Sequence, residues 1–161
     1  MRSVATVRNW IAAESVSTYG CGWMRSQVET TAPPPPAPRV LVVDDVPDVR
    51  DLHSGFLRGC GLDVSTAENG VLALDEARRA VPQVVVTDIQ MPVMNGLDLC
   101  RRLRADAATR DIGVVVVTGD ASDWIQAAAL DAGCDVVLAK PCSRMLLLAT
   151  IRRLLERTHH A

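Results

Sequence analysis

Apolar residues from Arg39 onward alternate between two arrangements along the chain. Short runs in which most residues are apolar predict β-strands over residues 39–44, 62–67, 83–88, 112–119 and 135–140. The longer segments between them carry apolar residues three and four positions apart, which predicts helices over residues 46–60, 69–80, 96–106, 122–133 and 143–157. Five strands therefore alternate with five helices.

The composition of the strand runs indicates how the strands pair. Runs such as "QVVVTD" (83–88) and "IGVVVVTG" (112–119) are continuously apolar rather than alternating, which is typical of a parallel sheet covered on both faces. Right-handed crossovers then predict an α/β fold with a doubly wound sheet. Ligands bind such a sheet outside the carboxyl ends of its strands, where the strand order reverses. We expect the functional site at that edge.

Helical spacing also predicts which residues face the core. In the first helix these are Val49, Leu52, Phe56 and Leu57, and in the second Leu72, Ala73, Ala77 and Ala80. In the fourth helix, Ser122 is expected to cap the N-terminus and Gly133 the C-terminus. The last helix has its core stripe at Leu147, Ile151, Leu154 and Leu155, and Met145, Leu146 and Leu148 widen the apolar arc.

The N-terminal segment differs from the rest of the chain. Residues 1–38 end in "APPPPAP" (32–38), which favours polyproline II and cannot continue a helix or an inner strand. We therefore predict a disordered or weakly structured tail with a proline-rich linker over residues 1–38, one domain over residues 39–158 and a short C-terminal tail over residues 159–161.

Charge and cysteine usage narrow the function classes. The formal net charge is −2 and no basic stripe is present, so we expect no nucleic-acid partner. No apolar run reaches the roughly 18 residues of a membrane span, and the start of the chain lacks the apolar region of a secretory signal. The five cysteines include no CxxC pair, which favours reduced thiols and a cytoplasmic location. The three histidines lack metal-ligand spacing.

Polar residues gather at the predicted strand ends. Asp44 and Asp45 end the first strand, Asp88 the third, Thr118 the fourth and Lys140 the fifth. If the strand order is 2-1-3-4-5, the first and third strands are neighbours and the three aspartates share one pocket at the point where the order reverses. Crowded carboxylates repel one another, and a hard cation such as Mg²⁺ resolves this through oxygen ligands. A hydroxyl and an ammonium then complete a cradle for a phosphoryl group.

The lysine in this set is the single lysine of the chain, whose other basic residues apart from histidine are all arginine. Chance is one explanation. The alternative is that the site needs a compact ammonium, because a planar guanidinium has a different shape and donor geometry.

Four segments carry a family resemblance. They are "VVDD" (42–45), "VVVTDIQMPVMNG" (84–96), "VVVVTG" (114–119) and "GCDVVLAKP" (133–141). Their order on the β/α alternation makes residues 39–157 resemble the receiver domain of response regulators in two-component signalling. The resemblance implies a flavodoxin-like fold with five parallel strands in the order 2-1-3-4-5 and five helices. It also implies a cis peptide bond between Lys140 and Pro141.

The resemblance further implies the role of each site residue. Asp88 would be the phosphoacceptor, Thr118 the switch hydroxyl and Lys140 the partner of the phosphoryl group. Mg²⁺ would be bound by Asp44, Asp45, Asp88 and the main-chain carbonyl of Gln90. The phosphodonor would be a sensor histidine kinase or a phosphotransfer protein, and the domain would catalyse only its own phosphorylation and dephosphorylation, so it is not expected to be an enzyme in the usual sense. Asp120 and Gln90 are candidates for setting the dephosphorylation rate.

Two positions depart from the family pattern. Relatives usually carry an aromatic residue where this chain has Val137, and often a phenylalanine where it has Cys142. Transmission of the phosphorylation signal is therefore an open question. One alternative is a degenerate receiver that acts as a phosphate-independent interaction module, and another is a hydrolase on the same sheet.

The output is expected to be a protein contact. Only four residues follow Arg157, so we expect a stand-alone receiver. Trp124 is expected near the rim of the buried face of its helix, and the last helix is apolar over a wide arc. One explanation is a homodimer or partner surface formed by the last two helices and the strand between them. The other is that the last helix buries more of its surface than an average edge helix.

Overall fold

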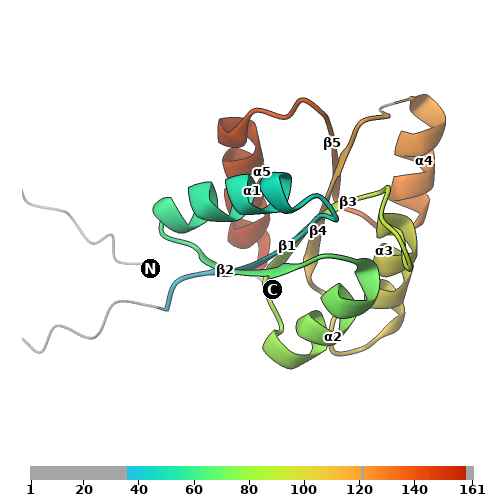
Figure 1. Cartoon of the computed structure of the whole chain (residues 1–161). Coiled ribbons are helices and arrows are strands. Elements are labelled where there is room, and N and C mark those ends of the chain that lie inside the picture. The colour runs from blue at the N-terminus through green and yellow to red at the C-terminus, as the bar shows by residue number, and fades with distance from the viewer. Residues whose placement is uncertain (1–35, 121, 159–161) are drawn as a thin grey trace, which may run out of the picture. The chain divides into compact units, whose positions relative to one another are not determined.

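The computed structural model describes residues 36–120 and 122–158, in which five strands and five helices alternate (Figure 1). The elements are β1 (Arg39–Val43), α1 (Pro47–Gly59), β2 (Asp63–Ala67), α2 (Gly70–Ala80), β3 (Val84–Asp88), α3 (Gly96–Ala105), β4 (Gly113–Thr118), α4 (Asp123–Asp131), β5 (Val136–Ala139) and α5 (Arg144–Thr158). All ten predicted elements are present, and their ends differ from the prediction by at most two residues. Residues 1–35 and 159–161, which hold most of the predicted tails, lie outside the described residues.

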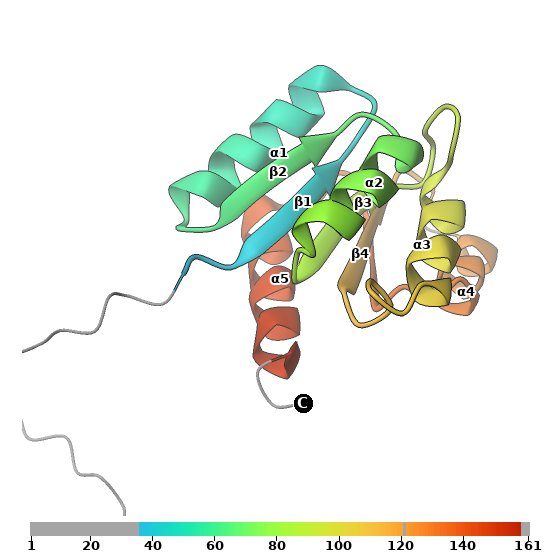
Figure 2. The ribbon, with the colours of Figure 1, turned by 90° about the horizontal axis from the view of Figure 1, so that it is seen from below.

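The sheet has the predicted topology. All neighbouring strands are parallel and their order is β2-β1-β3-β4-β5. Helices α1 and α5 cover one face, and α2, α3 and α4 cover the other (Figures 1 and 2). Each face has its own hydrophobic core, because the continuous valine runs of the strands supply side chains to both sides. The flavodoxin-like fold class is confirmed.

The strand register brings the predicted site residues to one edge. Val43 is paired with Thr87, so the next residues, Asp44 and Asp88, leave adjacent strands at the same level. On the other side of β3, Asp88 is paired with Val117, the residue before Thr118. Thr118 is in turn paired with Ala139, the residue before Lys140. The carboxyl edge therefore collects residues that are far apart in the sequence.

The inner face of α1 differs from the prediction. Leu57 is buried as expected, and Val49 and Phe56 are partly buried. Leu52, however, is 54% exposed, and Ser54 is buried in its place. Leu52 and Ser54 are two positions apart, which places them about 200° apart around the helix axis. Contacts with β2 and α5 therefore turn α1 so that the line through Ser54 and Leu57 faces inward and Leu52 faces outward.

The predicted face of α2 was partly wrong in a similar way. Ala73 and Ala77 are buried, but Leu72 is exposed and Ala80 is only partly buried. The buried leucine is Leu74, which lies one turn from Ala77 and shares its face. Packing of α2 against α3 therefore selects the next leucine along the chain.

The ends of α4 and the stripe on α5 follow the prediction closely. Ser122 occupies the N-cap position of α4, although its side chain makes no capping hydrogen bond. The C-cap is Ala132, one residue before the predicted Gly133, and Gly133 follows it with a φ of 92°, a left-handed conformation that favours glycine. The predicted stripe of α5 is buried at Leu147, Ile151, Leu154 and Leu155. Leu148 is also buried, so the exposed apolar arc is narrower than predicted.

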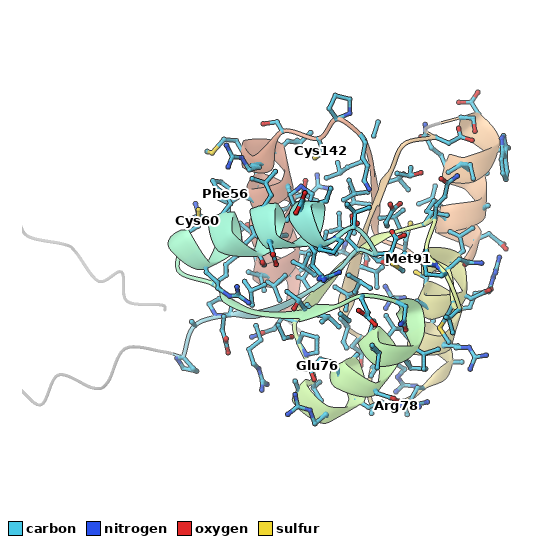
Figure 3. The ribbon with its side chains drawn as sticks, in the orientation of Figure 1. Phe56, Cys60, Glu76, Arg78, Met91 and Cys142 are labelled. Atoms are coloured by element: carbon cyan, nitrogen blue, oxygen red, sulfur yellow. The ribbon has the colours of Figure 1, made fainter. Side chains whose placement is uncertain are left out.

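The cysteines between Cys60 and Cys142 are free thiols. Burial raises the pKa of Cys100 to about 12 and that of Cys134 to about 11, so both are protonated at neutral pH. Cys60 and Cys142 are only partly buried and lie with Phe56 on the α1 and α5 side of the sheet (Figure 3). Among the described helices, none has the length and hydropathy that crossing a membrane requires.

Candidate functional site

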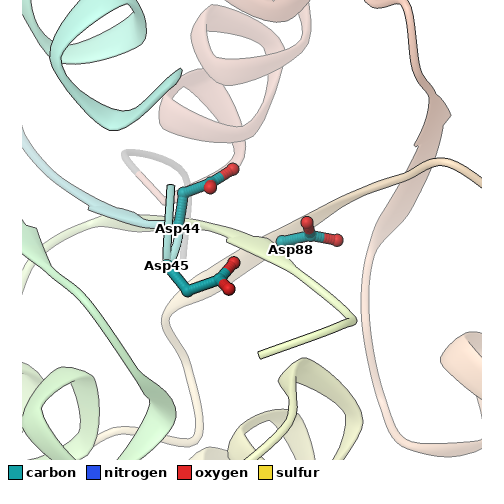
Figure 4. A group of neighbouring side chains, drawn as sticks. All are labelled: Asp44, Asp45 and Asp88. Carbon is teal, nitrogen blue, oxygen red and sulfur yellow. The ribbon is translucent and has the colours of Figure 1, made fainter. Parts of the chain in front are cut away.

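Three carboxylates converge at the carboxyl edge of the sheet. Asp44 and Asp45 follow β1, and Asp88 is the last residue of β3 (Figure 4). One carboxylate oxygen from each lies within 4.8 Å of the others, and no second cluster of this kind occurs among the described histidine, cysteine and acidic residues. All of these donors are oxygens, which fits a hard cation such as Mg²⁺. The three aspartates that the sequence places at the switch point of the sheet therefore do lie together there.

Lys140 lies between two of the carboxylates. Its Nζ donates to Oδ2 of Asp88 at 2.6 Å and to Oδ2 of Asp44 at 3.3 Å. The side chains of these aspartates are 11% and 5% exposed. Burial by itself lowers the pKa of Lys140, but the hydrogen bond and charge of Asp88, with those of Asp44, outweigh it and raise this pKa above its usual value. The carboxylates are therefore already partly compensated, contrary to the picture of three unpaired charges.

Main-chain groups fix the remaining oxygens of these two aspartates. Oδ1 of Asp88 accepts from the N–H groups of Ile89 at 2.6 Å and Gln90 at 3.3 Å. Oδ1 of Asp44 accepts from the N–H of Val46 at 2.9 Å. Both carboxylates are thus held between backbone amides and one ammonium, which defines their orientation before any ligand binds.

Asp45 differs from its two neighbours. Its side chain is exposed, and within residues 36–120 and 122–158 its carboxylate makes no hydrogen bond or ion pair. A cation arriving from solvent would therefore meet Asp45 as the carboxylate with the most open coordination sites. Gln90 lies in the loop after β3, where its main-chain carbonyl remains a predicted ligand.

The backbone of Asp44 is held on both sides. Its N–H donates to the carbonyl of Ala67 at 3.2 Å, and its carbonyl accepts from Nη1 of Arg50 at 2.7 Å. Arg50 was not among the site residues predicted from the sequence. Nothing in the local sequence distinguishes this arginine from the others, because its contact depends on the direction in which its side chain folds back from α1.

The loop that follows Asp88 is tightly constrained. Val93 has a φ of 69° and is 85% exposed, which is an unfavourable conformation for a β-branched residue. The loop is closed by a hydrogen bond from the N–H of Gly96 to the carbonyl of Ile89 at 3.0 Å. An added Cβ on Gly96 would lie 2.1 Å from the carbonyl oxygen of Asp88. Glycine is therefore required there for the loop to approach the end of β3.

Thr118 lies at the same edge and holds the next loop. Its side chain is buried, and its hydroxyl oxygen accepts from the N–H of Asp120 at 3.2 Å. An added Cβ on Gly119 would meet nothing within 4 Å, so there is open space beside the site. Asp120 is exposed. The Lys140-Pro141 peptide bond is cis, as the resemblance implies.

The two unusual positions lie on opposite faces of the sheet. Val137 is partly buried and packs against the core beneath α2, α3 and α4. Cys142 is partly buried and packs against the core beneath α1 and α5. Both positions therefore contribute small side chains to the two cores, in place of the aromatic rings of the family pattern.

Comparison with known proteins assigns these features to a family. The family model described as "Response regulator receiver domain" matches residues 40–152. The chain is 38% identical over 123 residues to the "DNA-binding dual master transcriptional regulator RpaA" of Synechocystis, covering 75% of this chain and 50% of that protein. It is 41% identical over 120 residues to the "Response regulator MprA" of Mycobacterium leprae, covering 74% and 52% respectively. The chain thus spans about half the length of these two curated relatives.

Solved structures agree with the sequence comparison. The chemotaxis protein CheY4 of Vibrio cholerae has a TM-score of 0.70 and 30% identity, covering 73% of this chain and 98% of that one. A CheY-like receiver domain protein of Methanospirillum hungatei has a TM-score of 0.72 and 26% identity, covering 78% and 99%. The family model covers more than half of the chain, and the similar structures share its fold, so this chain belongs to the response regulator receiver domain family.

Proposed function

We propose that this domain accepts a phosphoryl group on Asp88 in a Mg²⁺-dependent reaction of a two-component phosphorelay in the cytoplasm. The observation that carries the proposal is the position of the Asp88 carboxylate. It ends a buried strand, is oriented by backbone N–H groups and Lys140, and lies beside the carboxylates of Asp44 and Asp45. The phosphodonor is a phosphohistidine of a sensor kinase or a phosphotransfer protein.

The chemical step is a nucleophilic displacement. A carboxylate oxygen of Asp88 attacks the phosphorus, the P–O bond forms, and the P–N bond to the histidine breaks. The electron pair of that bond leaves with the imidazole, which takes up a proton. Bound Mg²⁺ supplies charge neutralisation on the transferred group, and Asp44, Asp45 and Asp88 with the main-chain carbonyl of Gln90 would hold it.

The remaining site residues act after or around the transfer. Lys140 is placed to pair with the phosphoryl group because its Nζ already contacts Asp88. Thr118 would turn its hydroxyl to a phosphoryl oxygen, which would release the N–H of Asp120 that it now accepts from. The loop between β4 and α4 would move as a consequence. Asp120 and Gln90 are exposed beside the site, where they would influence the approach of hydrolytic water.

Metal removal is the direct test of the proposal. With Mg²⁺ and acetyl phosphate, the full chain is expected to gain one phosphoryl group, detected by intact mass as a base-labile adduct. With EDTA in place of Mg²⁺, labelling is expected to be lost, because the charge on the transferred group is no longer neutralised.

Three outcomes would contradict the proposal. Equal labelling with and without metal would remove Mg²⁺ from the reaction. No labelling from acetyl phosphate or from any phosphorylated histidine kinase would favour the alternative, a degenerate receiver that acts as an interaction module. Turnover of free phosphate esters would instead indicate a hydrolase.

We also propose that the signal leaves through a homodimer surface on α4, β5 and α5. Trp124 on α4 is 66% exposed and Leu146 on α5 is 52% exposed, on helices that lie on either side of the edge strand β5 (Figure 1). The charges of the two helices are opposite. Exposed Asp123 and Asp131 lie on α4, whereas exposed Arg152 and Arg153 lie on α5. A two-fold pairing that sets α4 of one copy against α5 of the other would match these charges.

The double variant Leu146→Glu with Trp124→Ala tests this surface. We expect it to be phosphorylated like the wild type but to lose phosphorylation-dependent self-association, measured by analytical ultracentrifugation with and without acetyl phosphate. Leu72→Glu is the matched control, because it changes an exposed leucine on α2. A wild type that stays monomeric in both states would show that the exposed residues do not form a homodimer surface.

A further inference from the structure

We propose that Arg50 is a positioning residue that orients Asp45 for the cation. This inference rests on the proposed function, because it assumes a cation at the aspartate cluster. Arg50 lies in α1 and is partly buried. Its Nη1 donates to the main-chain carbonyl of Asp44 at 2.7 Å, a distance typical of a strong charge-assisted hydrogen bond.

The geometry of the peptide bond links this contact to Asp45. The carbonyl of Asp44 and the N–H of Asp45 belong to one planar peptide group. The N–H of Asp44 is already bound to the carbonyl of Ala67 at 3.2 Å. With Arg50 on the carbonyl, the peptide plane that leads into Asp45 can no longer rotate freely, so the backbone position from which the Asp45 side chain starts is restrained.

Asp45 needs this indirect support because it has no direct one. Lys140 and backbone amides fix the carboxylates of Asp44 and Asp88. The Asp45 carboxylate makes no hydrogen bond or ion pair within the described part of the chain. Mg²⁺ demands near-ideal octahedral geometry, so a ligand that swings freely costs affinity. Arg50 supplies the constraint from the opposite side of the peptide.

The surroundings of Arg50 show that its charge is not used in an ion pair. It lines a pocket of about 470 Å³ together with Glu68, Asp75, Glu76 and Arg79. Glu76 is paired with Arg79, whereas Arg50 makes no ion pair with the described residues. The acidic lining offsets the charge of Arg50 at a distance and leaves its guanidinium available for the carbonyl of Asp44.

Two explanations of Arg50 predict opposite effects on metal binding. If Arg50 acts only as a positive charge near the cluster, its removal reduces repulsion and the cation binds more tightly. If Arg50 orients Asp45, its removal frees the peptide and the cation binds more weakly. Metal affinity therefore separates a positioning role from a general electrostatic effect, without any phosphorylation assay.

The test is a Mn²⁺ titration of the full chain, followed by the electron paramagnetic resonance signal of the free ion. Mn²⁺ prefers the same oxygen ligands as Mg²⁺. We expect Arg50→Ala to weaken Mn²⁺ binding about tenfold, a change of about 1.4 kcal/mol. Arg50→Lys, which keeps the charge and a donor, is expected to lose less. Thermal melting without metal checks that both variants are folded. If only one of them folds, its Mn²⁺ affinity alone is compared with that of the wild type.

Arg58→Ala is the matched control. Arg58 also lies in α1 and donates from Nη2 to a main-chain carbonyl, that of Val64 at 2.8 Å, but it is not part of the aspartate cluster. We expect Mn²⁺ affinity to be unchanged in this variant. If Arg50→Ala binds Mn²⁺ as well as the wild type or better, or if Arg58→Ala weakens binding equally, the positioning role is wrong. If the wild type itself binds no Mn²⁺, the proposed metal site fails and the role of Arg50 fails with it.

Discussion

Asp88→Asn is expected to abolish phosphoryl labelling of the chain. The substitution keeps the shape of the side chain and an oxygen that can accept from the N–H groups of Ile89 and Gln90. It removes the negative charge, and a neutral amide is a far weaker nucleophile toward phosphorus than a carboxylate. With Mg²⁺ and acetyl phosphate, intact mass should therefore show no adduct on the variant under conditions that label the wild type fully.

Asp131→Asn is the control for this experiment. Asp131 is exposed on α4 and lies outside the aspartate cluster, so this variant should label like the wild type. Equal labelling of Asp88→Asn and the wild type would show that the phosphoacceptor is another residue. Peptide mapping of the borohydride-reduced adduct would then identify it.

Lys140→Met is expected to destabilise the metal-free domain by about 3–5 kcal/mol, the usual cost of leaving buried charges without their partner. Asp44 and Asp88 are the charges concerned, because both lose their shared ammonium. Urea unfolding in EDTA measures the loss. Added MgCl₂ should recover part of it, because a cation that binds only the folded state stabilises that state.

The pH dependence of this loss follows from the pKa of Lys140. This pKa is raised above its ordinary value of 10.5 in the folded state. The stabilisation by Lys140 is therefore fully present below the unfolded value and is lost only as the pH rises through the raised folded value. We expect a constant difference between wild type and Lys140→Met from neutral pH to about pH 9, well below the unfolded value.

Lys140→Arg separates charge from shape. It keeps a cation beside the two carboxylates, so most of the stability should remain. Phosphorylation should still be impaired, because a planar guanidinium does not reproduce a compact ammonium between Asp88 and a phosphoryl group.

A metal-free Lys140→Met domain as stable as the wild type would show that the two aspartates do not depend on Lys140.

The missing aromatic residue at position 137 bears on how the state of the site reaches its surface. The hydroxyl of Thr118 already holds the N–H of Asp120, so its rotation would loosen the start of the loop that leads to α4. Val137 lies on the neighbouring strand and is partly buried. No ring stands at this position to follow a movement of Thr118, which is the difference from the family pattern that the sequence indicates.

The sequence by itself determined the order of the elements and the edge of the sheet that carries the site. Continuous valine runs indicate strands buried on both faces, and such strands form parallel sheets. Once the strands are parallel, their carboxyl ends meet at one edge. The placement of Asp44, Asp88 and Lys140 at that edge therefore required no knowledge of tertiary contacts.

Tertiary structure alone decided the rotation of the helices and the partners of the charged groups. Helical period leaves the buried face uncertain by about one residue, or 100°. Leu52 and Leu72 were consequently assigned to the core although they face solvent. The difference arises because neighbouring elements, not local spacing, select the face that packs.

Tertiary packing also decided which side chains contact one another in the site. The contact between Lys140 and Asp88 joins residues 52 positions apart, and that with Asp44 joins residues 96 positions apart. Arg50 is closer in sequence to Asp44, but its hydrogen bond depends on α1 packing against the sheet so that its side chain turns back to the strand end. Strand ends are fixed by backbone pairing, whereas side-chain partners are fixed by the packing of helices on that sheet.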